Sequence, residues 1–353
     1  MKIFQCQKCA NPVFFENNHC NNCGSSLGFL IESGKLISLT SYDTSWKILN
    51  SKYSTYKYCK NHTNNVCNWL IPVEETFCKA CTLNRTIPNL NDTENYDKWT
   101  RLEIAKHRLV FQLQQLGLPL KDKENFPSNG LCFDFLSKKD RNESNKDIMT
   151  GHANGVITIL LAEADSVHRE QLRKQMSEPY RTLIGHFRHE VGHYYWDVLI
   201  RNSPEVLSKF RTIFGDESQD YSEALNHYYK NGPQPNWQTN FISKYASSHP
   251  WEDWAETWAH YLHLMDTLET AYNFNMNLSF KNVETIQLQN IKNPYKCIDF
   301  KEIVDSCIPL FFAINSLNRS MGIADIYPFI ITPASIKKMT FIHELLLKQK
   351  NTV

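Results

Sequence analysis

The chain has 353 residues, with 38 Lys and Arg against 37 Asp and Glu and a hydrophobic fraction of 42%. This composition excludes a disordered chain, which has few apolar residues and a large charge imbalance. The net charge of +1 also argues against a general polyanion binder, which is usually strongly basic. The length predicts about two domains. The unusual feature is the cysteine content, since eight of the eleven cysteines lie within the first 81 residues.

The cysteines indicate a compartment before they indicate a function. The segment Met1–Cys6 contains neither the apolar core nor the small-residue cleavage site of a secretory signal. No segment approaches the ~18 consecutive apolar residues of a membrane span. We therefore expect a cytoplasmic protein without a membrane segment. In a reducing compartment, closely spaced cysteines indicate metal binding rather than disulfides.

Residues 1–90 form the first predicted domain, a small zinc-ribbon module with two sets of four cysteines. The sets are Cys6, Cys9, Cys20 and Cys23, and then Cys59, Cys67, Cys78 and Cys81. The first set has two CxxC knuckles, whose four thiolates can surround one Zn²⁺. In the second set, Cys59 and Cys67 lack this spacing. The sequence therefore leaves open that His62 replaces one of those two cysteines, or that ligands are shared between the sets.

A zinc ribbon does not by itself name a function, because such modules bind protein, bind nucleic acid or hold a fold together. Residues 1–95 carry nine Lys and Arg against seven Asp and Glu, a balance that does not favour contact with a phosphate backbone. We expect two structural Zn²⁺ ions here, which would stabilise a region with little core of its own. A structural or protein-docking role is favoured over nucleic-acid binding.

Residues 91–353 form the second predicted domain, which is mainly helical with a short β-sheet, so the expected fold class is α+β. A polar linker containing a proline is predicted over 84–92. A helix is predicted over 93–116, where apolar residues recur every three or four positions until Gly117. This helix would open the second domain.

In the rest of the second domain, short apolar runs predict strands, and two short segments predict breaks between helices. Apolar and partly β-branched runs predict strands at 132–136 and 155–161. After them the chain is expected to be mainly helical, with breaks at 203–204 and 231–235. The remaining cysteines, Cys132, Cys297 and Cys307, are isolated along the chain and are expected to be inert core thiols.

The clearest chemical motif is His189-Glu190-Val191-Gly192-His193. On a helix, a spacing of four places both imidazoles on one face, where they can ligate one Zn²⁺. Glu190 then lies beside the metal, where its carboxylate can accept a proton from water. The helix is expected to start near 177–179 and to extend over 180–201. The alternative is a pair of core histidines satisfied by their neighbours.

A catalytic zinc site needs a third protein ligand. The metzincin pattern fails, because Trp196 and Leu199 stand where that pattern requires glycine and histidine. A second helix beginning near Pro250 carries Glu252 and Glu256 on one face. Glu252 is the predicted metal ligand, and Glu256 would accept the second ring N–H of a ligating histidine.

Other residues of this second helix bear on the same site. His260 and His263 remain possible replacement ligands, although the two glutamates explain more positions. Ala255 and Ala259 would allow a close approach to the helix that carries the two motif histidines. A solvated helix face is the alternative, and the surrounding tryptophans argue against it.

These two segments, 180–196 and 249–263, resemble the bacterial zinc-binding metallopeptidases that carry an amino-terminal zinc-ribbon domain. The likeness includes Cys67-Asn68-Trp69-Leu70 and the segment ending at Pro88, and so covers nearly the whole chain. More broadly, the pattern is similar to gluzincins such as thermolysin and anthrax lethal factor. That resemblance implies Glu252 as ligand and Glu256 as its supporting residue. The gap between the motifs is longer than in thermolysin, which leaves the substrate cleft undefined.

The same resemblance implies that Tyr245, seven residues before Glu252, stabilises the oxyanion. His249 is a weaker candidate for that role. The predicted reaction is zinc-dependent hydrolysis of a peptide bond in a polypeptide substrate, with Glu190 as general base. An edge strand often holds such substrates in extended form, and 155–161 is the candidate, an internal strand being the alternative.

Two rival functions remain open at this stage. One is a non-catalytic binding module that recruits a protein partner through the zinc ribbon and keeps the second domain as a scaffold. The other is a protease that acts at nucleic acid, which the low net charge does not favour. The full prediction is three Zn²⁺ ions per chain, one catalytic and two structural.

Overall fold

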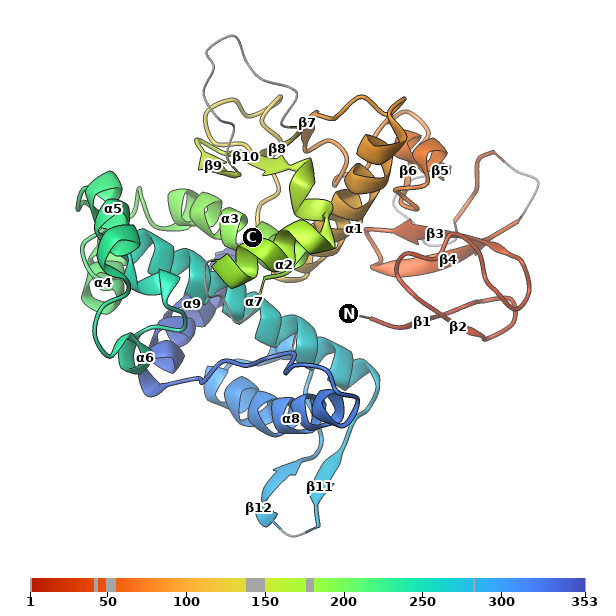
Figure 1. Cartoon of the computed structure of the whole chain (residues 1–353). Coiled ribbons are helices and arrows are strands. Elements are labelled where there is room, and N and C mark those ends of the chain that lie inside the picture. Colours follow the sequence, from red (N-terminus) through yellow and green to blue (C-terminus); the bar gives the residue numbers. More distant parts are fainter. Residues whose placement is uncertain are drawn as a thin grey trace.

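The computed structural model describes residues 2–40, 44–48, 55–137, 150–175, 181–281 and 283–352. Its architecture is α+β, as predicted, with a small β-rich amino-terminal region beside a larger and mainly helical region (Figure 1). None of the described helices is both long and apolar enough to span a membrane.

The amino-terminal region consists of antiparallel strand pairs. They are β1 (Phe4–Gln5) with β2 (Pro12–Val13), β3 (Ser26–Leu30) with β4 (Lys35–Leu39), and β5 (Tyr56–Tyr58) with β6 (Leu70–Pro72). A short 3-10 helix, Lys60–Asn64, follows β5. Phe15 and Phe29 pack on Phe111 of helix α1 (Thr93–Gln115), with ring centroids 5.1 and 5.6 Å apart. The two regions therefore share a hydrophobic core.

Helix α1 occupies the segment predicted to be helical, ending one residue early. Asp92 caps its start by accepting hydrogen bonds from the backbone N–H groups of Glu94 and Asn95. Gly117 follows the helix with a φ of 72°, a left-handed conformation that suits glycine at a helix end. The capping residue and the glycine fix the length of α1.

A four-stranded sheet has the order β7-β8-β10-β9. The strands are β7 (Asn84–Thr86), β8 (Cys132–Leu136), β9 (Gly151–Ala153) and β10 (Val156–Leu160). β8 pairs in parallel with β7 and β10, and β9 runs antiparallel to β10. The strand expected over 155–161 is thus β10, which is internal, and β9 forms that edge among the described residues. The segment expected to be a linker contains β7. Residues 84–86 form a strand there because their backbone pairs with β8.

Helices fill most of the remaining chain. They are α2 (Ser166–Gln175), α3 (Leu183–Leu199), α4 (Pro204–Phe214), α5 (Tyr221–Asn231), α6 (Trp237–Asn240), α7 (Pro250–Asn273), α8 (Phe300–Ser320) and α9 (Pro333–Thr352), with short 3-10 turns at Leu161–Ala164, Tyr245–Ser247 and Pro294–Lys296. The breaks near Pro204 and Pro235 are confirmed. The helix start expected at 177–179 lies outside the described residues, and α3 begins after Thr182, whose side chain accepts from the N–H of Gly185.

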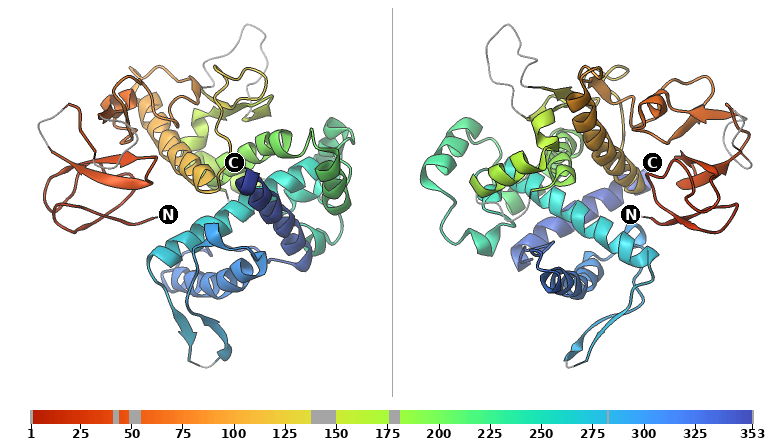
Figure 2. Two further views of the ribbon diagram at one scale, coloured as in Figure 1. Left: turned by 180° about the vertical axis from the view of Figure 1, so that it is seen from behind. Right: turned by 45° about the vertical axis from the view of Figure 1, so that its right-hand side comes forward.

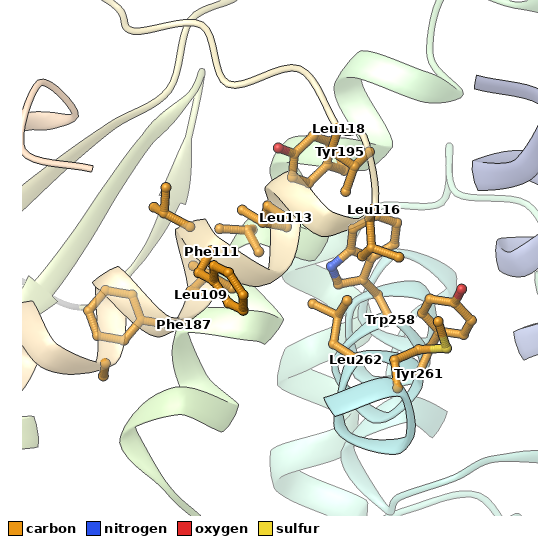
Figure 3. Packing of buried hydrophobic residues seen from close by; sticks show 14 of the residues in the cluster. Leu109, Phe111, Leu113, Leu116, Leu118, Phe187, Tyr195, Trp258, Tyr261 and Leu262 are labelled. Atoms are coloured by element: carbon orange, nitrogen blue, oxygen red, sulfur yellow. The ribbon is translucent and has the colours of Figure 1, made fainter. Parts of the chain in front are cut away.

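One hairpin interrupts this part, which is mainly helical as expected. Strands β11 (Leu278–Phe280) and β12 (Val283–Leu288) pair antiparallel between α7 and α8. Both views in Figure 2 show this hairpin and α8 on the side of α7 that is remote from the sheet. The hydrophobic core lies between the sheet on one side and the hairpin and α8 on the other. Figure 3 shows Leu109 and Leu113 of α1 packed among side chains of α3 and α7. α1 thus supports both helices that carry the predicted motif.

Candidate metal centre

The predicted motif residues lie on two helices that cross in direct contact. α3 presents His189, Glu190 and His193, and α7 presents Glu252 and Glu256. α7 begins at a proline after a histidine N-cap, so both its glutamates fall in the first two turns, one turn apart on the same face.

Gly192 makes the close approach of α3 and α7 possible. A Cβ atom at this position would lie 3.1 Å from Cα of Ala255 and 3.2 Å from Cδ1 of Trp258. The indole N–H of Trp254 donates a 2.8 Å hydrogen bond to the carbonyl oxygen of Gly192. The backbone of α3 therefore touches α7 directly, which brings the carboxylate of Glu252 to the imidazoles of α3.

Three potential metal ligands converge at this crossing. Nε2 of His189 lies 3.2 Å from Nε2 of His193 and 3.1 Å from Oε2 of Glu252. Nε2 of His193 lies 3.5 Å from the same carboxylate oxygen. Zn–N and Zn–O bonds of about 2.0–2.2 Å at tetrahedral angles separate neighbouring ligand atoms by roughly 3.3–3.6 Å. The three atoms are therefore spaced as one zinc ion requires.

The protonation pattern also fits a cation. Nδ1 of His189 lies 2.7 Å from Oε1 of Glu256, and because a carboxylate only accepts, Nδ1 carries the hydrogen. In the neutral ring this leaves a lone pair on Nε2, directed towards Oε2 of Glu252. That oxygen is buried and has no hydrogen-bond partner among the described residues. Lone pairs facing each other at this distance need a proton or a metal cation between them.

The electrostatic field of the site also favours a positive charge. Burial opposes a charge on His189, but the carboxylates of Glu252 and Glu256 outweigh it and raise its pKa well above the ordinary value. Burial likewise opposes a charge on Glu252, but the two imidazoles hold its pKa well below its usual range. The pocket therefore attracts positive charge, as a Zn²⁺ site does.

Glu190 lies beside these ligands and is held by a residue that the sequence did not single out. Its Oε1 is 3.2 Å from Nε2 of His186, and Nδ1 of His186 is 3.5 Å from Oε2 of Glu163. Burial lowers the pKa of His186, but the two carboxylates outweigh it and raise that pKa to about 9. The only sequence signal for His186 was its position one helical turn before Glu190.

Two hydroxyl groups support the acidic side chains. The hydroxyl of Tyr221, on α5, donates a 2.5 Å hydrogen bond to Oε1 of Glu252. The hydroxyl of Ser243 donates a 2.6 Å hydrogen bond to Oε2 of Glu256. Neither residue belongs to a motif, and no sequence signal marked them. Tyr245 lies close by, with its ring centroid 6.1 Å from that of His189.

The amino-terminal cysteines form two compact sets. In the first, Sγ of Cys6 is 3.7 Å from Cys23, and Sγ of Cys9 is 3.5 Å from Cys20. The four Sγ atoms of this set, and those of the set Cys59, Cys67, Cys78 and Cys81, lie within 4.8 Å of one another. A zinc tetrahedron with Zn–S bonds of about 2.3 Å has edges of roughly 3.8 Å. Both sets match this geometry, and all these thiols are free.

The comparisons with known proteins relate the chain to zinc-binding families. Residues 95–345 match the family model described as putative zinc-binding metallo-peptidase. The chain belongs to this family. Residues 3–92 match a zinc-ribbon domain. Below, residues 3–92 are called the zinc ribbon and residues 95–345 the peptidase domain.

Relatives of this metallo-peptidase family member occur in mycobacteria. An uncharacterized protein of Mycobacterium bovis and two of Mycobacterium tuberculosis are each 42% identical to it over 345 residues, which is 97% of this chain and 94% of theirs. No solved structure matches the chain.

Several alternatives considered for the peptidase domain are excluded by contacts. Among the described residues, the ligand atoms that group with Glu252 are those of His189 and His193, and not those of His260 or His263. Nδ1 of His260 bonds to the hydroxyl of Tyr327, and Nδ1 of His263 contacts the guanidinium of Arg188. His249 caps α7 through Nδ1, while its Nε2 is 3.2 Å from the carbonyl oxygen of Gln219. These hydrogen bonds occupy His249, which makes it a poor oxyanion donor.

The open question in the zinc ribbon is also resolved by geometry. His62 stacks on Tyr58 with ring centroids 3.7 Å apart, and its Nδ1 lies 2.8 Å from the carbonyl oxygen of Cys67. Among the described residues, His62 belongs to none of the groups whose ligand atoms lie within 4.8 Å of one another, and the two cysteine sets share no member. Cys81 also groups with Glu103 and His107. The histidine that does approach the second set is His107 of α1, which no motif in the sequence marked. Cys132, Cys297 and Cys307 are buried away from both sets.

Proposed function

We propose that the protein is a zinc-dependent peptidase that hydrolyses peptide bonds of a polypeptide. The observation that carries this proposal is the convergence of ligand atoms of His189, His193 and Glu252 within 4.8 Å of one another. Glu190 follows His189 on α3 and is close enough for both imidazoles to lower its pKa. A Zn²⁺ ion held there would supply Lewis-acid polarisation of the scissile carbonyl and would acidify water. Two further Zn²⁺ ions would occupy the cysteine sets of the zinc ribbon and stabilise it.

Glu190 is the proposed general base. Burial raises the pKa of its carboxyl group, but His186 and the neighbouring imidazoles outweigh burial and lower it, so the carboxylate is ionised near neutral pH. It accepts one proton from the attacking water and then delivers that proton to the amide nitrogen, which leaves as an amine. His186 orients the carboxylate through its 3.2 Å contact.

The surrounding side chains hold the ligands in place. Glu256 accepts from Nδ1 of His189 and so directs Nε2 towards the metal position. The hydroxyl of Tyr221 donates to Oε1 of Glu252 and so holds that carboxylate in place. Tyr245 is proposed as donor to the oxyanion: burial raises the pKa of its hydroxyl, which therefore keeps its hydrogen at neutral pH.

The sheet edge next to the site is a suitable position for an extended substrate. β9 packs on α3, and the ring of His152 on β9 lies 6.3 Å from the ring of His193. We propose that a polypeptide pairs with β9, the edge strand, rather than with the internal β10. The zinc ribbon is proposed to have a structural or protein-docking role. Its free metal-spaced thiols favour a reducing compartment, such as the cytoplasm.

The test is cleavage of an unstructured polypeptide by the full chain loaded with zinc. The Glu190→Gln variant should retain parental zinc content and lose at least ~100-fold in kcat, the lower end for removal of a general base. Glu94→Gln, at an exposed carboxylate paired with Lys98, is the matched control and should be fully active. If the zinc-loaded parent cuts nothing, or if Glu190→Gln cuts at the parental rate, the proposal is wrong.

A further inference from the structure

His107 connects the peptidase domain to the second cysteine set of the zinc ribbon. This residue lies on α1, which belongs to the peptidase domain, and only 4% of it is exposed. Its Nε2 lies 3.6 Å from Sγ of Cys81 and 4.0 Å from Sγ of Cys78. Distances of this size between nitrogen and sulfur are those of an N–H···S hydrogen bond shared by two acceptors.

The other side of the imidazole ring decides what Nε2 does. Nδ1 lies 2.8 Å from the backbone carbonyl oxygen of Glu103, which only accepts, so Nδ1 carries a hydrogen. The second cysteine set already offers four thiolates, the number that a structural zinc takes. His107 approaches this set from outside, facing Cys78 and Cys81. Both ring nitrogens then face acceptors, the carbonyl oxygen of Glu103 on one side and the zinc-bound thiolates on the other, so each nitrogen carries a hydrogen and the ring is an imidazolium. In that form Nε2 donates to the thiolates and is not a fifth ligand.

A buried four-thiolate zinc centre needs such a donor. Four thiolates around Zn²⁺ carry a net charge of −2, and all four cysteines of this set are buried. Buried charge is costly unless it is paired or hydrogen-bonded. His107 is itself anchored by its neighbours, since Oε2 of Glu103 is 3.5 Å from Nδ1, and Trp69 packs edge-on against the ring at 5.4 Å.

We propose that His107 donates a hydrogen bond to the thiolates of Cys78 and Cys81, and so makes the second zinc centre a joint between the zinc ribbon and the peptidase domain. This inference rests on the proposed zinc binding by the ribbon, and it is independent of peptide hydrolysis. Zinc in this centre then stabilises α1 as well as the ribbon.

Further along the same helix, α1 holds the two helices of the catalytic centre. The side-chain N–H of Gln112 donates a 2.7 Å hydrogen bond to the carbonyl oxygen of Leu262 on α7. Its Oε1 accepts a 3.0 Å hydrogen bond from Nε of Arg188 on α3, the residue before His189. His107 and Gln112 are five residues apart, about 7.5 Å along the helix axis. The proposed joint therefore lies in the same rigid element that aligns α3 with α7.

The test measures zinc release from the full chain into a chelating dye, using His107→Ala and His107→Gln. Glutamine keeps an N–H near the position of Nε2, and alanine does not. His227→Ala is the matched control, because His227 is an exposed histidine of α5 that belongs to none of the groups of possible metal ligands among the described residues. Loss of a residue that supports metal ligands typically weakens a site by about 10–100-fold.

We expect one zinc ion to leave His107→Ala at least ~10-fold faster than the parent, with His107→Gln in between and His227→Ala unchanged. In a Cys6→Ser background, which removes the first centre, the same acceleration should appear in the remaining ribbon zinc. Removing that zinc should also lower the Tm of the helical transition in the parent, and by less in His107→Ala.

Three results would overturn the proposal. The first is parental release of both ribbon zinc ions from His107→Ala. The second is a helical transition in the parent that does not respond to the loss of ribbon zinc. The third, which needs no variant to fold, is a cobalt-substituted parent whose spectrum shows three thiolates and one imidazole at this centre, since His107 would then be a ligand. None of these readouts depends on peptidase activity.

Discussion

The contact at Gly192 predicts that its replacement by alanine weakens the metal centre, although alanine is the better helix former. An alanine in the middle of α3 gains about 1 kcal/mol in helix propensity. Against this, its Cβ would lie 3.1 Å from Cα of Ala255 and 3.2–3.3 Å from two atoms of Trp258. The first of these atoms is backbone inside α7, and the indole is fully buried, so neither can move cheaply.

The balance of these terms gives the expected magnitude. Overpacking of a tight core costs about 1–3 kcal/mol, so the net change in the free energy of unfolding should be a loss of up to about 2 kcal/mol. To relieve the clash, α7 must move away from α3 by a few tenths of an ångström. That shift moves Glu252 relative to His189 and His193 by a large part of the ~0.5 Å within which the geometry of a functional site must be held. We therefore expect zinc affinity at this centre to fall by about 10-fold.

Urea unfolding and zinc competition with a chelator measure both effects for Gly192→Ala. Gly151→Ala is a matched control, because a Cβ at Gly151 meets no atom within 4 Å. The control should keep the parental zinc affinity. If Gly192→Ala is more stable than the parent and binds zinc equally well, the helices do not make the contact described. In that case the contact at Gly192 does not position Glu252.

Three further predictions concern side chains around the centre. Tyr221→Phe removes the hydrogen bond to Glu252 and should lower zinc affinity by about 10-fold without changing the helix content, measured by chelator competition and circular dichroism. Tyr245→Phe should lower kcat by about 100-fold at unchanged zinc content, and unchanged kcat would remove its oxyanion role. Burial raises the pKa of the Glu163 carboxyl group, but His186 outweighs burial and lowers that pKa from 4.5 to about 2. The ionised carboxylate therefore contributes about 3 kcal/mol to the free energy of unfolding. This contribution is complete above pH 4.5 and is lost as the pH falls towards 2. Glu163→Gln should therefore be less stable than the parent at pH 6, with about a quarter of that difference left at pH 2.5 in urea unfolding. A difference independent of pH would contradict this.

The local part of the site was predictable from the sequence because its information is local. A spacing of four fixes the relation of His189 to His193 on any helix. Glu252 was identifiable because Pro250 marks a helix start and the tryptophans indicate a buried helix. In the same way, Asp92 and Gly117 mark the ends of α1, and the cysteine spacing identifies both ribbon sets.

The residues that sequence reasoning missed act across long separations in the chain. Tyr221 reaches Glu252 over 31 residues, and His107 reaches Cys81 over 26, with no motif to connect them. The edge strand β9 has only three residues, and Gly151-His152-Ala153 contains no β-branched side chain. These three residues form a strand because they pair with β10. The strand at 84–86 is likewise created by its partner β8 rather than by its own composition.

Metal analysis of the full chain is the most direct experiment on the proposed metal sites. The parent should contain three zinc ions per chain, and Glu252→Gln should contain two, because only the centre between α3 and α7 loses a ligand. His260→Gln, at a buried histidine of α7 that bonds to Tyr327 instead, should still contain three. A parent with fewer than three zinc ions, or a Glu252→Gln variant that keeps all three, would contradict the metal centre described here.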